Sequence, residues 1–310
     1  MEMRDQDLSR RKFLLGSSAA VVGGLLIPRG ASGMVGRARR ARAGSIPARI
    51  TGATVNPSVY HMSNWVKGAK TFDSYVGHPL ATTIQKIYMQ EGQYYTAPLP
   101  SRFTQLAAVG CQFIVCVYPS RTTDESSKLS HFLHLLKSHG IVYQAALVNE
   151  WNTKDRFTPQ AYLDYWRHYA PVVKRAGVPL ADMVCASSNR AAFAKIKPGF
   201  PTHPLPDAYW IDFYATGYGF HVRLAASGGL LGQAEKHGVP AGIGEFGWSA
   251  TGGDPRGGWS TWHDYCSYLV RLAPRLPLGC LYWGSKSVDV VTSANDPKVP
   301  GIRRVVSAFQ

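Results

Sequence analysis

The sequence of 310 residues predicts an α/β fold built as a single (β/α)8 barrel, and three observations lead to this prediction. Short apolar runs alternate with segments of helical periodicity, which is the pattern of repeated strand–helix units. The apolar runs number eight. They extend over about 260 residues without a linker or an internal repeat, and ~250 residues is typical of a barrel of eight parallel strands.

Each expected strand is a short apolar run bounded by turn-forming residues. The strands are expected at residues 50–56, 84–90, 112–118, 141–148, 182–187, 209–214, 240–246 and 278–284. In a barrel of this kind the functional residues lie at the carboxyl ends of the strands. The segments that follow these eight runs are therefore the places where a site is expected.

The clearest helix is predicted over residues 158–177. Thr158 is its cap, Pro159 lies in the first turn, and the glycine at the end stops it. Apolar and aromatic residues recur between them at the spacing of one helix face, and they are expected in the core. These residues are Tyr162, Tyr165, Trp166, Tyr169, Val172, Val173 and Ala176. Two further helices are expected after Ser127 and Ser260.

A doubly wound open sheet is the alternative fold. It usually carries a phosphate-binding glycine loop after its first strand, and residues 50–57 contain none. One G-x-G-x-x-G run does occur, from Gly242 to Gly247, but it lies within the expected seventh strand and is followed by a loop. We interpret the match as accidental, so the sequence predicts no cofactor.

Residues 1–43 have the features of an export leader, and residues 44–310 form the predicted barrel domain. The paired arginines Arg10 and Arg11 precede an apolar run and a small-residue site, which resembles the twin-arginine signal of bacteria. A membrane anchor is the alternative, but the run is shorter than the ~20 residues that span a bilayer. The resemblance implies a secreted protein that uses the twin-arginine export machinery, or a membrane-tethered one if the leader is uncleaved.

The formal charge of +15 arises from 34 Lys and Arg against 19 Asp and Glu. Nine of these basic and three of these acidic residues lie in the leader, so residues 44–310 carry a net charge of +9. No basic stripe interleaved with aromatic residues is visible, so nucleic acid is not an expected partner. The composition excludes disordered, collagen-like and disulfide-scaffold proteins. Five cysteines without a C-x-x-C spacing are expected to be buried free thiols.

The expected fourth and seventh strands each end at an acidic residue, Glu150 and Glu245. They are 95 positions apart, about 32 for each of three strand–helix units, as the barrel requires. Two carboxyl groups across a barrel mouth suit glycosidic bond cleavage, because one donates a proton and the other is the anion beneath the sugar carbon. A structural hydrogen bond or salt bridge is the alternative for either residue alone. Two such residues, both flanked by aromatic side chains, favour the chemical role.

The chain resembles the large clan of retaining glycoside hydrolases with a (β/α)8 barrel and catalytic glutamates on strands four and seven. Asn149-Glu150 matches the Asn-Glu pair that ends strand four in that clan. The match implies that Glu150 is the general acid/base and that Asn149 binds the sugar 2-hydroxyl. Glu245-Phe246-Gly247 is similar to the nucleophile segment of β-mannanase-type family 26 enzymes, which implies that Glu245 is the nucleophile.

The same resemblance implies further substrate contacts. A strand-six tyrosine that hydrogen-bonds the nucleophile has two candidates, Tyr214 and Tyr218, and Trp283 matches a strand-eight tryptophan under the sugar ring. The sequence departs from the family 26 pattern at residues 147–148, where a histidine is absent. The arginine common on strand two has no clear counterpart near residues 89–91. These departures concern the particular family and substrate more than the clan.

Aromatic residues supply a second argument for a sugar site. Several fall at expected strand ends or in the loops that follow, where flat rings could stack on sugars and where a core residue is not expected. They are Trp151, Trp248, Trp259, Trp283, Tyr118 and Tyr218. For any single one of them, capping of the barrel is the alternative. Asn56, at the end of the first strand, is also expected to contact substrate.

The sequence thus predicts a secreted glycoside hydrolase that cleaves a β-linked oligosaccharide or polysaccharide with retention, through an intermediate on Glu245. Retention predicts carboxyl groups about 5–5.5 Å apart, and inversion about 6.5–9.5 Å. A carbohydrate-binding barrel without turnover is the alternative, although loss of catalysis usually replaces one of the two glutamates. No H-E-x-x-H, H-x-H or carboxylate cluster predicts a metal site. A monomer is expected.

Overall fold

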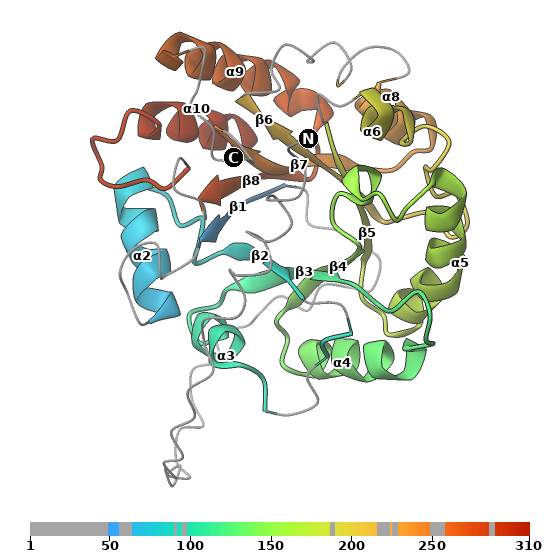
Figure 1. The fold of residues 1–310 in the computed structure, drawn as a ribbon. Helices are drawn as coiled ribbons and strands as arrows, with labels where there is room; N and C mark the ends of the chain where they lie inside the picture. Colours follow the sequence, from blue (N-terminus) through green and yellow to red (C-terminus); the bar gives the residue numbers. More distant parts are fainter. Residues whose placement is uncertain are drawn as a thin grey trace, which may run out of the picture. The chain divides into compact units, whose positions relative to one another are not determined.

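The computed structural model describes residues 49–55, 64–89, 92–94, 98–186, 190–215, 224, 229–248, 258–284 and 289–310. Within them, eight parallel strands wind into a nearly closed barrel, with helices around the outside (Figure 1). The strands are β1 (Ile50–Val55), β2 (Ile84–Tyr88), β3 (Gln112–Val117), β4 (Val142–Leu147), β5 (Leu180–Cys185), β6 (Ala208–Tyr214), β7 (Ala241–Gly247) and β8 (Gly279–Gly284). Each lies within two residues of its expected bounds, so the predicted (β/α)8 barrel is confirmed.

The hydrogen-bonded strand order is β1-β8-β7-β6-β5-β4-β3-β2, and every pair is parallel. The two end strands, β1 and β2, also lie side by side. The Thr54 hydroxyl is 3.5 Å from the Lys86 carbonyl, and a Cβ on Gly52 would lie 2.5 Å from the Ile84 carbonyl. Because all strands run the same way, their carboxyl ends form one end of the barrel, which we call the mouth.

The helices cover the outer faces of the strands (Figure 1). They are α2 (Trp65–Val76), α3 (Ser101–Ala107), α4 (Ser126–Ser138), α5 (Pro159–Arg175), α6 (Arg190–Ala194), α8 (Leu230–Lys236), α9 (Gly258–Leu272) and α10 (Val299–Phe309), with 3-10 turns η2 (Trp151–Thr153) and η4 (Ala273–Arg275). The predicted helix from Thr158 is confirmed as α5. The Thr158 hydroxyl accepts a hydrogen bond from the Ala161 N–H, and the aromatic face is buried in the core.

Two apolar clusters build the core. The larger contains residues of both strands and helices, and the smaller consists mostly of strand residues and includes Trp210. The Trp210 indole donates a hydrogen bond to the Gln144 side chain at 2.6 Å. A Cβ on Gly242 would lie 2.4 Å from the Trp210 ring, and a Cβ on Gly244 would lie 2.6 Å from the Asp212 carboxylate. Gly242 and Gly244 therefore make room for side chains of β6, and Gly247 makes room for the Asp289 carboxylate, which explains the G-x-G-x-x-G run without a nucleotide.

All five cysteines are free and buried, as predicted. Burial raises the pKa of the Cys111 and Cys116 thiols to about 12. Both groups therefore stay protonated at neutral pH and pack as small apolar side chains.

The predicted leader, residues 1–43, lies outside the described residues. Among the residues that are described, no helix has the length and apolar character needed to cross a membrane. The leader and its export role therefore remain predictions from the sequence.

Candidate active site

The segment that follows β4 has an unusual backbone. Val148 and Glu150 have φ angles of 59° and 50°, in the left-handed region that a β-branched residue such as valine rarely enters. The Asn152 side chain holds this segment in place, since it donates to the Cys185 carbonyl and accepts from the Cys185 N–H, both at 2.9 Å. Backbone strain of this kind persists only where the surrounding structure supports it, and it concentrates at functional sites. Here it accompanies a buried glutamate that is only 3% exposed.

An irregularity in β7 sets the place of the second glutamate. Ile211 of β6 is paired with Ile243, but the next residue, Asp212, is paired with Glu245. Gly244 is thus the extra residue of a bulge, and bulges redirect side chains next to active sites. As a result, Glu245 lies beside Asp212, and its carboxylate accepts a hydrogen bond from the Tyr214 hydroxyl. Of the two predicted tyrosines, Tyr214 makes this bond.

Three carboxyl groups meet at the mouth. One oxygen from each of Glu150, Asp212 and Glu245 lies within 4.8 Å of the other two, and all three residues are buried. They come from the ends of β4, β6 and β7, so the barrel brings together residues that are far apart in the sequence. The two glutamates predicted from the sequence are therefore close neighbours.

Lys86 of β2 is the positive charge of this cluster. Its ammonium lies 2.7 Å from a Glu245 oxygen and 3.0 and 3.1 Å from the two Asp212 oxygens, and its side chain is fully buried. Burial by itself lowers the pKa of Lys86, but the Asp212 and Glu245 carboxylates raise it well above the ordinary value. Lys86 therefore remains charged and pairs two carboxylates of the mouth.

Lys86 and Asp212 were not among the residues predicted from the sequence, in which a strand-two arginine was sought near residues 89–91 without a clear match. Lys86 lies earlier in that strand, between Gln85 and Ile87, and it supplies a cation where an arginine was sought. A signal was present in both cases, because a charged residue stands inside a run of otherwise buried residues in β2 and in β6. Charged residues are almost never fully buried unless they are paired.

Asp212 holds its proton unusually tightly. Burial raises its pKa from 3.8 to about 7, although Lys86 lowers it; the nearby Glu150 charge raises it further, and hydrogen bonds from Lys86 and Asn149 lower it. Three carboxyl groups share one ammonium in a space with little water, so full ionisation is unfavourable. We conclude that the cluster retains a proton near neutral pH.

The carboxylates could in principle bind a metal ion, since each offers an oxygen to a common point. However, the Lys86 ammonium already contacts Asp212 and Glu245 at 2.7–3.1 Å. A cation placed among these oxygens would lie close to that charge and be repelled by it. The arrangement thus suits carboxyl chemistry better than metal binding.

Aromatic side chains border the cluster. Trp283, at the end of β8, and Tyr88, at the end of β2, are half-buried and meet edge to face with their ring centres 5.8 Å apart. Tyr118, just after β3, is also half-buried. Among the described residues, the Trp283 indole N–H has no hydrogen-bond partner. Each of these rings is partly exposed and lies at the mouth.

Two other predicted aromatic contacts have to be corrected. Trp151 is fully buried and stacks on Tyr162, with ring centres 4.1 Å apart, and a Cβ on Gly199 would lie 2.2 Å from its ring. Trp248 is 3% exposed and packs against Trp262 in the core. Neither ring has a free face, so the expected stacking on sugars does not fit their packing.

Four predicted residues remain, and the structure describes the side chain of one of them, Asn149. Asn56 and Tyr218 lie outside the described residues, as does the side chain of Trp259. Asn149 is described: it is buried, its amide bonds Asp212, and its Oδ1 has no partner within the described part of the chain.

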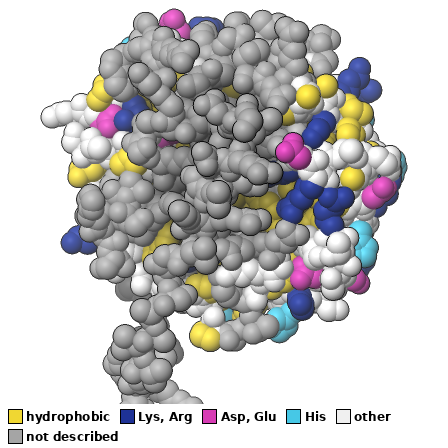
Figure 2. All heavy atoms as spheres, in the orientation of Figure 1, with side chains coloured by type: hydrophobic (Ala, Val, Ile, Leu, Met, Phe, Trp, Pro, Cys, Tyr) yellow, Lys and Arg dark blue, Asp and Glu magenta, His cyan; other side chains and the backbone are white. Residues whose placement is uncertain are grey.

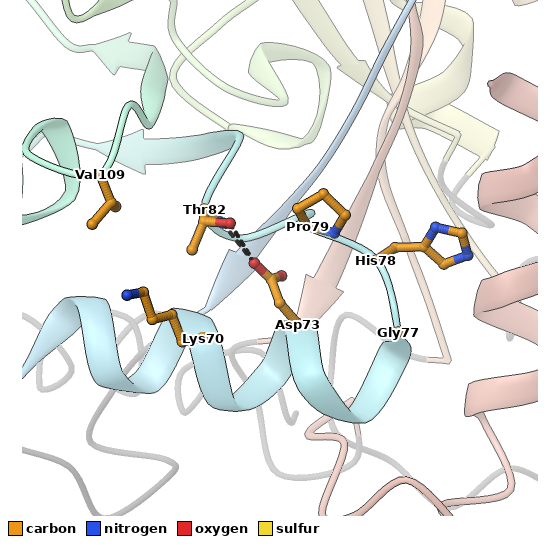
Figure 3. Close-up of a pocket in the computed structure, with 7 residues that line it drawn as sticks. All are labelled: Lys70, Asp73, Gly77, His78, Pro79, Thr82 and Val109. Carbon is orange, nitrogen blue, oxygen red and sulfur yellow. Dashed lines mark hydrogen bonds between the residues drawn. The ribbon is translucent and has the colours of Figure 1, made fainter. Parts of the chain in front are cut away.

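A surface depression also lies away from the mouth, and its polar contacts stabilise the fold. It is lined by Asp73, Thr82 and their neighbours, where the segment after α2 leads into β2 (Figure 3). The Asp73 carboxylate accepts hydrogen bonds from the N–H groups of Leu80, Ala81 and Thr82 and from the Thr82 hydroxyl. It therefore ties the turn to the helix, and it lies at the amino end of the strand, away from the mouth.

Comparison with known proteins gives a likeness of fold. No protein-family model and no curated protein matches the chain. A fungal β-1,4-galactanase structure aligns with a TM-score of 0.53 and 12% identity over 83% of this chain and 100% of its own. A 4-O-α-L-rhamnosyl-β-D-glucuronidase from Fusarium oxysporum aligns with a TM-score of 0.52 and 13% identity over 85% of this chain and 70% of its own.

An endo-β-1,3-glucanase of family 128 from Amycolatopsis mediterranei, in complex with laminaritriose, aligns with a TM-score of 0.50 and 14% identity, over 82% of this chain and 98% of its own. These structural neighbours are glycoside hydrolases of several families. At such low identities the likeness establishes the barrel fold, and the resemblance to family 26 enzymes stays a prediction.

Proposed function

We propose that this protein is a retaining glycoside hydrolase that cleaves a β-linked glycan, with Glu150 as general acid/base and Glu245 as nucleophile. The observation that supports it most is the separation of these groups. One carboxylate oxygen of each lies within 4.8 Å of one oxygen of the other across the barrel mouth. Such close oxygens favour the short separation of retaining enzymes, whose carboxyl groups lie ~5–5.5 Å apart, over the ~6.5–9.5 Å that admits a water in inverting ones.

In the first step, the Glu245 carboxylate attacks the anomeric carbon while Glu150 gives its proton to the glycosidic oxygen. The bond between carbon and leaving oxygen breaks, and an ester between the sugar and Glu245 forms. In the second step, Glu150 takes a proton from a water molecule, which attacks the same carbon and releases Glu245. Each step transfers one proton through Glu150, and configuration is inverted twice.

The other residues of the cluster prepare these two glutamates. Lys86 and Tyr214 contact the Glu245 carboxylate and orient it as an anion before substrate binds. Asp212 holds the other side of the Lys86 ammonium. The Asn149 Oδ1 and the Trp283 N–H are buried and lack partners among the described residues, so they could bond sugar hydroxyl groups only if substrate binding opens the mouth.

The test is hydrolysis of a panel of aryl β-glycosides and of β-glucans, β-mannans and β-galactans. We expect Glu245→Gln and Glu150→Gln to lower kcat/KM on the substrate that is cleaved by about 10³-fold or more. Glu235→Gln is the matched control, because Glu235 pairs with Arg275 on the outside of the barrel. We expect wild-type activity from it.

Two further measurements address the mechanism. A 2-fluoro glycoside should leave a sugar on the peptide that contains Glu245, and NMR should show the β-anomer as the first product. Hydrolysis that survives Glu245→Gln unchanged would refute the proposal. Binding of glycans without hydrolysis by the wild type would instead favour a carbohydrate-binding barrel.

Export is a separate proposal, supported by the sequence alone. We propose that residues 1–43 direct the folded monomer through the twin-arginine pathway. Replacement of Arg10 and Arg11 by lysine should retain the protein inside the cell, as measured by fractionation. Export that persists in this variant would contradict the proposal.

A further inference from the structure

The pairing of β4 with β5 stops short of the mouth. It ends at Ala146 and Ala181, although β5 continues to Cys185. On its other side β5 stays paired with β6 up to the mouth. There Cys185 lies beside Asp212, and the Ala186 N–H donates to the Asp212 carbonyl at 2.9 Å. The backbone groups of Cys185 that face β4 therefore need a partner other than a strand.

The Asn152 side chain takes the place of the missing strand. Its amide accepts from the Cys185 N–H and donates to the Cys185 carbonyl, both at 2.9 Å, and it donates to the Ala192 carbonyl at 3.3 Å. Of the side chains, only those of asparagine and glutamine carry the amide of a peptide group. On the face drawn in Figure 2, Lys and Arg side chains are grouped at the surface. Asn152, in contrast, is fully buried, so its polar atoms need these bonds.

Asn152 belongs to the turn that carries Glu150. The Thr153 N–H and hydroxyl donate to the Glu150 carbonyl at 3.0 and 2.9 Å, which closes the turn η2 around Asn152. Three consecutive residues of this segment have different partners. Glu150 meets the carboxyl cluster, Trp151 stacks on a tyrosine of α5, and Asn152 bonds the end of β5. The turn is thus held against α5 by an aromatic ring and against β5 by an amide.

Both ends of this amide bridge lead to the carboxyl cluster. Glu150 precedes Asn152 by two residues, and Asp212 is the β6 partner of Cys185. The bridge therefore joins the segment that carries Glu150 to the strand pair that carries Asp212. One oxygen of each of these two carboxyl groups lies within 4.8 Å of the other. A displacement of about 1 Å in a catalytic group can lower the rate by about 100-fold, so a tie at this place bears on catalysis.

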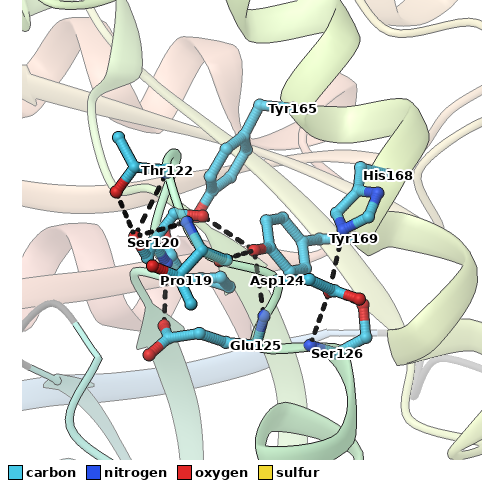
Figure 4. Close-up of polar contacts among 10 residues, drawn as sticks. Pro119, Ser120, Thr122, Asp124, Glu125, Ser126, Tyr165, His168 and Tyr169 are labelled. Atoms are coloured by element: carbon cyan, nitrogen blue, oxygen red, sulfur yellow. Dashed lines mark hydrogen bonds and ion pairs between the residues drawn. The ribbon is translucent and has the colours of Figure 1, made fainter.

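The loop after β3 is held in a different way. The Tyr165 hydroxyl donates to the Pro119 carbonyl at 2.9 Å, and the Tyr169 hydroxyl donates to the Ser120 carbonyl at 2.7 Å (Figure 4). Both tyrosines belong to α5. This loop thus depends on a helix outside the barrel, whereas the Glu150 turn is also tied to a barrel strand.

We infer that Asn152 is a positioning residue for the proposed acid/base: its amide ties the Glu150 turn to the end of β5 and thereby sets the distance between the Glu150 and Asp212 carboxyl groups. This inference rests on the proposed glycosidase function. Three backbone groups already engage the Asn152 amide, so it acts through Glu150 and not on the substrate. Loss of the tie weakens proton donation by Glu150 more than attack by Glu245.

Two aryl β-glycosides of the sugar that the wild type cleaves separate these two effects. Dinitrophenolate leaves without a proton, whereas unsubstituted phenol needs one from the acid. In Asn152→Ala we expect kcat/KM to fall by about 100-fold on the phenyl glycoside and by less than about fivefold on the dinitrophenyl glycoside. A variant that only lowers the folded fraction would lose activity equally on both.

The second measurement needs no substrate. It is the NMR titration of Asp212 in protein labelled with ¹³C-aspartate, with the signal assigned by its absence from Asp212→Asn. The nearby Glu150 charge raises the pKa of Asp212, which burial brings to about 7. Lys86 and Glu245, which also face Asp212, lie on strands that the substitution does not touch. If Glu150 moves away, its contribution falls, so we expect a lower midpoint in Asn152→Ala.

Asp207→Ala is the matched control, because it removes a tie at the amino end of the same strand. The Asp207 carboxylate accepts from the Leu180 N–H of β5 at 2.8 Å. Tyr169→Phe is a control at the mouth, since it removes a hydroxyl that holds the loop after β3. We expect both controls to keep the wild-type ratio between the two substrates and the wild-type midpoint of Asp212. Melting temperatures report how much each variant is destabilised.

Asn152→Ser is the milder variant, used if Asn152→Ala does not fold. It keeps a hydroxyl and leaves room for a water beside Cys185, but it cannot bond both backbone groups of that residue as the amide does. We expect it to change the substrate ratio and the Asp212 midpoint in the same directions as Asn152→Ala, by smaller amounts.

The outcomes separate this inference from the proposed function. Equal losses on the two substrates, with an unchanged Asp212 midpoint, would refute the inference and leave the glycosidase intact. The same changes in Asp207→Ala as in Asn152→Ala would also refute it, because any loosening of β5 would then suffice. A wild type that hydrolyses no glycoside would refute the proposed function. The Asp212 midpoint would then decide by itself: a fall in Asn152→Ala alone supports a distance set by Asn152, and an unchanged value overturns it.

Discussion

Two partly or fully buried carboxyl groups of this barrel show how the same residue type is used for support and for chemistry. Asp73 of α2 accepts four hydrogen bonds from neutral donors of the single turn that precedes β2. Asp212, at the carboxyl end of β6, shares one buried ammonium with Glu245 and lies near Glu150. The turn supplies all the hydrogen bonds given above for Asp73. Asp212 instead interacts with charged side chains from β2, β7 and the segment after β4.

The pKa shift alone does not separate these two roles. Burial raises the pKa of both groups, although the turn donors lower that of Asp73 and Lys86 lowers that of Asp212. The difference lies in the neighbours. Like charges within 4.8 Å make the protonation of the mouth cluster responsive to substrate and pH, whereas neutral donors around Asp73 do not.

The largest effect is expected from Lys86→Met, which keeps the length of the side chain and removes its charge. Asp212 and Glu245 then lose their shared partner, so we expect the free energy of unfolding to fall by about 3–5 kcal/mol. We also expect kcat/KM to fall by about 100-fold or more. Denaturant unfolding and steady-state kinetics measure the two effects.

Lys86→Arg keeps the charge and is the conservative control. It should restore part of the activity and part of the rate at which a 2-fluoro glycoside labels Glu245. Equal labelling rates in the wild type and Lys86→Met would contradict the role of Lys86 in orienting the nucleophile.

The next largest effect is expected from Asp212→Asn, which should change how the unfolding free energy and kcat/KM depend on pH. The folded-state pKa of about 7 lies above the value near 3.8 for the free group, so the stability from protonated Asp212 is complete below about pH 4 and is lost as pH rises through 7. The advantage of the wild type over the variant in unfolding free energy should shrink over that interval. The ionisation near pH 7 in the profile of kcat/KM should move to lower pH, because one negative charge is removed. Identical pH profiles would show that Asp212 does not couple to the reaction.

Tyr214→Phe is expected to have a smaller effect. It removes only the hydroxyl that donates to Glu245, while the ion pair to Lys86 remains. Loss of one hydrogen bond to a charged group should lower kcat/KM by about tenfold. Unfolding should change little, and an unchanged kcat/KM would mean that Lys86 alone orients the carboxylate.

The smallest effect on activity is expected from Asp73→Asn, the counterpart of Asp212→Asn at the opposite end of the barrel. It weakens the acceptor that fixes the turn, so the unfolding free energy should fall by about 1–3 kcal/mol. Hydrolysis should keep the wild-type kcat/KM and pH profile. A changed pH profile would remove the distinction between the two aspartates.

The fold was predictable because its signals are local. Apolar runs, the Thr158 cap and the helix face from Tyr162 depend only on residues near one another in the chain. The burial of Trp166 and Tyr169 follows from the same periodicity. For Trp151 the local rule failed, since a tryptophan after a strand end was taken as exposed and instead packs between α5 and Gly199.

The sequence by itself determined the barrel and the position of Glu150 and Glu245 at strand ends, because periodicity and strand count act along the chain. Only the tertiary structure decided which groups accompany them. Lys86 and Asp212 are 126 positions apart and meet because β2 and β6 face the same barrel interior. The protonation of the cluster depends on distances between strands, and no linear pattern contains those distances.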